Sequence, residues 1–202
     1  EINRVTAVTP GALAALALLC AEARLVTHEE LLVLCARLLD SLRASGARIT
    51  PRTVASKGEL RPEAIREAAQ MFLEAELLEA HGTGGARASE AGPGVAYRIP
   101  DRKRLELEPS KNHIVHFFVE RGLVAVAVLV PPGAPVDVAA VRERVKSLSK
   151  LFKHEFRFRA DASFDQIFDA TLAAMSLGAE ITVAVVGKYL DAKGFRILAA
   201  LD

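Results

Sequence analysis

Apolar residues recur at helical spacing through much of the chain, and residues typical of helix ends border the runs. Thr27-His28-Glu29-Glu30 has the form of a capping box, a hydroxyl followed three residues later by a glutamate. The apolar positions that follow are Leu31, Leu34, Cys35, Leu38, Leu39 and Leu42. This spacing predicts a helix that begins after Thr27 and is ended by Gly46.

A second helix and a hairpin follow in the first half. Pro62 lies where the first turn of a helix favours proline, and the apolar stripe that follows predicts a helix to about Glu76. Residues 77–81, the glycine-rich stretch 82–94 and the alternating residues 95–99 then predict a β-hairpin with a flexible tip. Two helices followed by a β-wing favour a winged-helix-like module.

The second half predicts further capped helices. Residues 110–119 predict a helix that continues toward the apolar run 123–130, and the proline-rich residues 131–135 break it. Asp137 caps an amphipathic helix, and Ser163-Phe164-Asp165-Gln166 is a second capping box. In the first of these helices Val138, Val141, Val145, Leu148 and Phe152 are expected inside, with Arg142, Arg144, Lys146 and Lys150 largely outside. Residues 181–186 predict a strand that Gly187 turns back through residues 188–190.

The expected fold is therefore mainly α with short β-hairpins, an α+β class built of winged-helix-like helical modules. We expect a helical, winged-helix-like subdomain over residues 1–100 and a charged, proline-bounded linker over 101–109. A second helical subdomain with a short C-terminal β-hairpin is expected over 110–202.

Composition excludes several classes of function. The 202 residues are 51% hydrophobic, which suffices for a buried core, and the formal charge of +1 with 5% aromatics disfavours nucleic-acid binding. The apolar runs 12–20 and 123–130 are far shorter than the ~20 residues of a membrane-spanning helix. Cys20 and Cys35 are expected to be buried packing residues in a reducing compartment. The chain starts without Met or a secretory signal, so we expect a piece of a longer polypeptide.

Catalytic chemistry finds little support in the residues. His113 and His116 share a helical face, but no third metal ligand lies nearby. The chain has no Gly-x-Ser-x-Gly elbow, and the glycines of 82–85 form neither a Walker loop nor a dinucleotide fingerprint. We therefore expect no catalytic residue, no metal and no cofactor.

The most cationic stretch is a candidate membrane contact. Its basic residues are Lys146, Lys150, Lys153, Arg157 and Arg159, and three phenylalanines are interleaved with them. Lysine and arginine near an anionic lipid surface contribute about 1 kcal/mol each. A solvated helix face is the alternative interpretation. Binding to DNA is disfavoured, because the helix from Pro62 carries Glu63, Glu67, Glu74 and Glu76 against Arg66 alone.

Three segments together carry a family resemblance. They are residues 3–10 (Asn-Arg-Val-Thr-Ala-Val-Thr-Pro), 111–118 (Lys-Asn-His-Ile-Val-His-Phe-Phe) and 151–156 (Leu-Phe-Lys-His-Glu-Phe) with 163–165 (Ser-Phe-Asp). In order and spacing they resemble the region C-terminal to the catalytic domain of membrane-bound glycerol-3-phosphate acyltransferases. The middle segment commonly reads Tyr-(Lys/Arg)-Asn-Asn-Ile-(Ile/Leu)-His-(Phe/Tyr)-Phe in that family, whereas this chain has Ser110 and His113 in place of the Tyr and the second Asn.

The resemblance implies an accessory role. The family's catalysis resembles a His-x-x-x-x-Asp dyad that activates the glycerol hydroxyl, and no histidine of this chain has an aspartate five residues on. The family's Pro-Glu-Gly-(Thr/Gly)-Arg phosphate-binding segment is absent as well. The chain would then pack against the catalytic domain of the same polypeptide, at the cytoplasmic face of the cell membrane as a peripheral protein.

Four residues of the middle segment are expected to be structural, namely Asn112, His116, Phe117 and Phe118. Asn112 and His116 would tie the helix to neighbouring backbone, and the 123–130 run would meet the catalytic domain or the bilayer. The alternative is a stand-alone winged-helix module that binds DNA or another protein.

Overall fold

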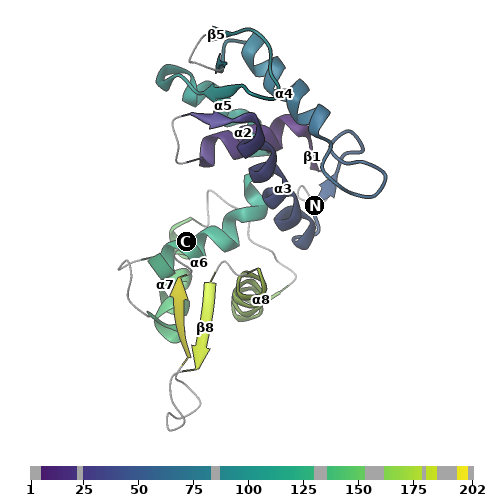
Figure 1. Ribbon diagram of the computed structural model, residues 1–202. Coiled ribbons are helices and arrows are strands. Elements are labelled where there is room, and N and C mark those ends of the chain that lie inside the picture. The colour runs from purple at the N-terminus through teal and green to yellow at the C-terminus, as the bar shows by residue number, and fades with distance from the viewer. Residues whose placement is uncertain are drawn as a thin grey trace. The chain divides into compact units, whose positions relative to one another are not determined.

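The computed structural model describes residues 6–21, 25–82, 87–129, 136–152, 162–178, 181–185 and 195–199 (Figure 1). Helices predominate and the sheets are small, so the fold is α+β as predicted. The chain divides into two compact units, residues 1–117 and 118–202.

The first unit is built around one apolar helix. Its elements are β1 (Ala7–Val8), α2 (Pro10–Cys20), β2 (Val26–Thr27), α3 (His28–Ala44), β3 (Arg48–Ile49), α4 (Pro62–Glu74), β4 (Glu79–His81), β5 (Arg87–Ala88), β6 (Ala96–Arg98), η2 (Asp101–Lys103) and α5 (Arg104–Val115). Helix α2 is buried from Ala12 to Leu19 and packs against α3, α4 and α5. Because its alanines and leucines are apolar on every side, it serves as the core around which the other helices lie.

Helices α3 and α4 follow the predicted pattern. The Thr27 hydroxyl accepts from the Glu30 backbone N–H at 3.2 Å, and a Glu30 carboxylate oxygen accepts from the Thr27 N–H at 2.8 Å. Gly46 follows α3 with a φ of +72°, a left-handed conformation that glycine adopts without strain. The apolar stripe of α4 is buried, including Ile65 and Phe72.

The predicted hairpin is present and belongs to a larger sheet. Strands β4 and β6 pair antiparallel, β2 pairs with the other edge of β6, and the strand order is β2-β6-β4-β5. The remaining strands of the unit, β1 and β3, form a two-residue parallel pair.

The stretch expected to be a linker is helical. Residues 101–109 form η2 and the first half of α5, and the division between units falls at Phe117–Phe118. Leu107 and Ile114, seven residues apart on one face of α5, are fully buried, and α5 packs against α2. This burial stabilises the helix around the internal Pro109 and outweighs the local signals of charge and proline.

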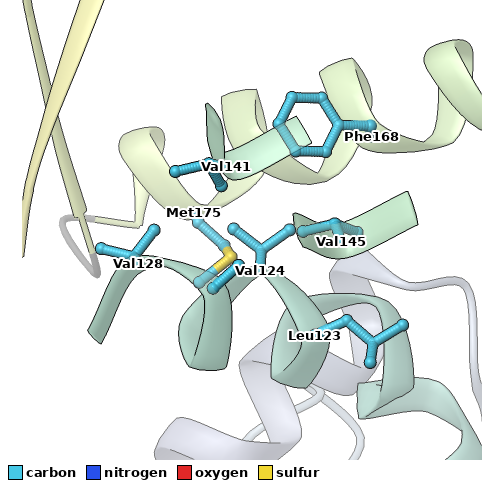
Figure 2. Close-up of a cluster of buried hydrophobic side chains, with 8 residues drawn as sticks. Leu123, Val124, Val128, Val141, Val145, Phe168 and Met175 are labelled. Atoms are coloured by element: carbon cyan, nitrogen blue, oxygen red, sulfur yellow. The ribbon is translucent and has the colours of Figure 1, made fainter. Parts of the chain in front are cut away.

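The second unit has a core of three helices. They are α6 (Val119–Leu129), α7 (Val138–Leu151) and α8 (Phe164–Leu177). Figure 2 shows side chains from all three meeting in one apolar cluster: Leu123, Val124, Val128, Val141, Val145, Phe168 and Met175. Val138, Leu148 and Phe152 pack against this cluster, so the predicted inner face of α7 is confirmed. The run 123–130, expected to meet another domain or the bilayer, buries four side chains in the unit's own core.

A three-stranded sheet completes this unit, with β7 (Val136–Asp137), β8 (Ile181–Val185) and β9 (Phe195–Ala199) in the order β7-β9-β8. Strands β8 and β9 pair antiparallel, from Ile181 opposite Ala199 to Val185 opposite Phe195. The return strand was expected at residues 188–190, which lie outside the described residues; the segment that pairs with β8 in the structure is 195–199. Pairing five residues on each side forms a longer ladder than the short return would allow.

Candidate functional site

The segment that carries the family motif lies at a break between helices. Helix α5 ends at Val115, a 3-10 turn η3 (His116–Phe118) follows, and α6 starts at Val119. The sequence predicted one continuous helix here, and that was wrong. His-Phe-Phe places three aromatic side chains in succession, and aromatic residues lose side-chain freedom against the preceding turn of a helix, which favours an interruption.

The two polar residues expected to be structural, Asn112 and His116, donate or accept no side-chain hydrogen bond to the backbone of the described residues. The Asn112 side chain is exposed and makes no hydrogen bond there. The Nε2 atom of His116 is buried and has no hydrogen-bond partner in the same part of the chain. The described residues thus show neither expected hydrogen bond: Asn112 lies on the solvent side of α5, and the centre of the His116 ring lies 4.1 Å from that of Phe117 with the rings tilted by 38°. Burial lowers the pKa of His116, which favours the neutral imidazole.

The basic stretch is only partly placed by the structure. Lys146 and Lys150, one helical turn apart on α7, are both exposed, and the Lys146 ammonium lies 4.0 Å from Glu143. Lys153, Arg157 and Arg159 lie outside the described residues. The two lysines thus lie on one exposed face of α7, with Glu143 beside Lys146.

Arg142 and Arg144 were expected largely on the outside of α7. In the structure both side chains bind to neighbouring helices of the same unit. The Arg142 guanidinium donates to Asp165 at 2.7 Å and to Asp169 at 2.5 Å on α8, and lies 4.4 Å from the centre of the Phe168 ring. Arg144 donates to the backbone carbonyl of Ala127 at 3.1 Å. Both side chains are long enough to reach a neighbouring helix, so they connect α7 to α8 and α6.

The cysteines have different surroundings. Cys35 is buried on α3, and burial raises the pKa of its thiol to about 12, so it is an inert packing residue as expected. Cys20 was expected to be buried and is exposed, because it is the last residue of α2, where the chain leaves the core.

Helix α4 has an acidic outer face. Glu63, Glu67 and Glu74 are exposed on it beside Arg66, as the sequence indicated, whereas Glu76, also expected on this helix, lies beyond its end at Glu74. Three carboxylates on the face of a helix repel the phosphates of a nucleic acid.

None of the described helices is by itself long and apolar enough to span a bilayer. Residues 101–115 and 119–129, two helices separated by the turn at 116–118, reach that length and composition only when they are taken together.

The family motif, residues 111–118, thus spans the last residues of α5 and the turn η3. Residues 1–193 match the family described as the glycerol-3-phosphate acyltransferase C-terminal region, and the chain belongs to this family. It is similar to proteins named "Putative acyltransferase plsB1" from Mycobacterium tuberculosis and Mycobacterium bovis, with 28% identity over 210 residues. The alignment covers 100% of this chain but 30% of each relative, so the chain spans about a third of their length. The resemblance stated from the motifs is confirmed.

Proposed function

We propose that this chain is the accessory, non-catalytic C-terminal part of a glycerol-3-phosphate acyltransferase. The parent protein would transfer an acyl group from a thioester to glycerol 3-phosphate in phospholipid synthesis. The family match over residues 1–193 carries the proposal. The absence of a His-x-x-x-x-Asp motif from the chain supports the non-catalytic part of it.

The partner in this proposal is the catalytic domain of the same polypeptide. The relatives are named acyltransferases, and this chain aligns with 30% of their length, which leaves ample chain for a separate catalytic domain. The chain's contribution would be to support that domain.

We propose further that the first unit is winged-helix-like and serves protein contacts. The order helix, strand, helix, helix and hairpin, with β2 beside the returning strand β6, supports this interpretation. The acidic outer face of α4 favours a protein partner over DNA.

An acyl-transfer assay tests the accessory role. The chain alone should give no transfer to glycerol 3-phosphate above background, while the longer protein that contains it should be active. Removing residues 1–202 of this chain from the longer protein should lower activity at least tenfold, with the catalytic domain still soluble. Transfer by the chain alone, or full activity after its removal, would refute the proposal.

A peripheral position at the cytoplasmic membrane surface is also part of the proposal, with Lys146 and Lys150 as described members of the contact. Replacing both by alanine should weaken binding to anionic vesicles about 30-fold, because each lysine contributes about 1 kcal/mol and 1.4 kcal/mol is tenfold. High salt should also weaken the binding of the unchanged chain to these vesicles.

The matched control for this vesicle experiment removes two exposed cations elsewhere, Arg37 and Lys57, by alanine substitution. Equal losses in the two double variants would indicate attraction by general charge. A vesicle affinity that does not depend on salt concentration or on lipid charge would contradict a surface role for α7.

A further inference from the structure

The first unit contains a polar crevice of about 450 Å³ away from the family motif. Its walls come from α2, β2, β4, β6 and the start of the helix that continues into α5. Three arginines line it, Arg98, Arg102 and Arg104, against two carboxylates, Glu79 and Asp101. The described lining thus has an excess of one positive charge.

Two of these arginines are held in place. Arg98 Nε and Nη2 donate to one oxygen of Glu79, Oε2, at 3.0 and 2.5 Å, across the β4–β6 pair. Arg104 Nη2 donates to the backbone carbonyl of Leu19 at 2.8 Å. Each guanidinium has five N–H donors, so both keep unused donors after these bonds.

The third arginine, Arg102, differs from these two. Arg102 is exposed and makes no ion pair with any residue that the structure describes. Fixed guanidinium groups beside a free one form an arrangement suited to an oxyanion, because guanidinium donors match the oxygens of phosphate in charge and geometry.

Glu79 offsets Arg98, its hydrogen-bond partner, so the excess of one positive charge comes from Arg102 and Arg104 against Asp101. The hydrogen bond from Arg98 lowers the pKa of the Glu79 carboxyl, and the charges of Arg98, Arg87 and His81 lower it further. The His81 Nε2 atom lies 3.9 Å from Glu79 Oε2. These neighbours favour the ionised form of Glu79, so its carboxylate would repel an anion bound in the crevice.

We propose that this crevice binds the dianion of a phosphate monoester. Arg102 is the donor unpaired among the described residues, and Arg98 and Arg104 are the ones held by Glu79 and by the Leu19 carbonyl. The volume exceeds that of a phosphate group alone, so the ligand is a phosphorylated molecule, either free in solution or a lipid headgroup. This proposal does not rest on the function proposed above.

Titration of the 202-residue chain with inorganic phosphate, followed by calorimetry, tests the site. Binding should be saturable, and Arg102→Ala should weaken it at least tenfold. Glu79→Gln should tighten it severalfold, because the amide still accepts from Arg98 but no longer repels the anion. Arg37→Ala, which removes an exposed arginine of α3 outside the crevice, should leave the affinity unchanged. Circular dichroism should show the same helix content in all variants.

Vesicles distinguish the two sources of phosphate. If the ligand is a lipid, vesicles containing phosphatidic acid should bind in an Arg102-dependent way, and neutral phosphatidylcholine vesicles should not. If it is a free metabolite, inorganic phosphate should bind in an Arg102-dependent way, whereas the phosphatidic acid vesicles should not. Absence of Arg102 dependence in both arms, or an equal loss in Arg37→Ala, would overturn the proposal.

Discussion

His28 shows how one buried polar side chain connects distant parts of the first unit. Its side chain lies in the first turn of α3 and is 3% exposed, with Nδ1 2.9 Å from the Tyr97 hydroxyl. The Gly92 backbone N–H donates to the same hydroxyl at 3.0 Å, and the hydroxyl hydrogen can donate to Nδ1 when the ring is neutral with its proton on Nε2. The His28 backbone N–H also donates to Val95 at 2.8 Å. Neutral His28 therefore holds the start of α3 against the returning arm of the hairpin.

Protonation of His28 should destabilise the protein. Burial lowers the pKa of His28 below 6.5, with Arg66 lowering it further and Glu29 opposing. Since the unfolded chain then binds more protons, this group's contribution to stability is fully present above pH 6.5 and is lost as pH falls below it. Urea unfolding between pH 7.5 and 5 should show the decline, and His28→Gln should reduce it.

The control for this experiment is His113→Gln, which changes an exposed histidine of α5. Its stability should fall with pH as in the unchanged protein. If His28→Gln and His113→Gln have the same pH dependence, the His28–Tyr97 pair does not set the response.

The sequence indicated Thr27 and Glu30 but not the His28–Tyr97 pair. A capping box is local, because its partners are three residues apart, whereas His28 and Tyr97 are separated by 69 positions. Arg142 shows the same limit, since its partners lie 23 and 27 residues away on α8. Helical periodicity indicates which face of a helix is polar and does not reveal which neighbouring helix an arginine reaches.

Two helices begin with complete capping boxes. Ser163 and Gln166 bond reciprocally at the start of α8, at 3.3 and 2.9 Å, as Thr27 and Glu30 do at the start of α3. Thr27→Ala and Ser163→Ala should each lower the free energy of unfolding by about 1 kcal/mol, because backbone N–H groups lose their acceptor. Chemical denaturation measures the loss. Ser147→Ala, at an exposed position within α7, should change stability by less than about 0.5 kcal/mol, and an equal effect there would contradict the capping argument.

The starts of α3, α4, α7 and α8 were predictable from capping residues and Pro62, whereas the starts of α5 and α6 were not. Residues 101–109 carry charges and Pro109, which are linker signals, yet Leu107 is fully buried. The return strand of the last hairpin could not be placed from Gly187, because strand pairing is decided by the whole ladder rather than by one turn residue. Local chemistry therefore located the element ends that carry a capping residue, and tertiary packing decided the others.

Each unit has a core of its own, and this separation should be visible in the whole molecule. Phe168 is 2% exposed in the second core, and Phe168→Ala should cost about 3–5 kcal/mol of that unit's stability. Hydrogen exchange should then accelerate in α6, α7 and α8, with α2 and α3 unchanged. Leu39→Ala, at a position 1% exposed on α3, should give the opposite pattern at a cost of about 2–5 kcal/mol. Uniform acceleration along the chain in both variants would mean that the two units unfold as one, because local opening follows cooperative units of structure.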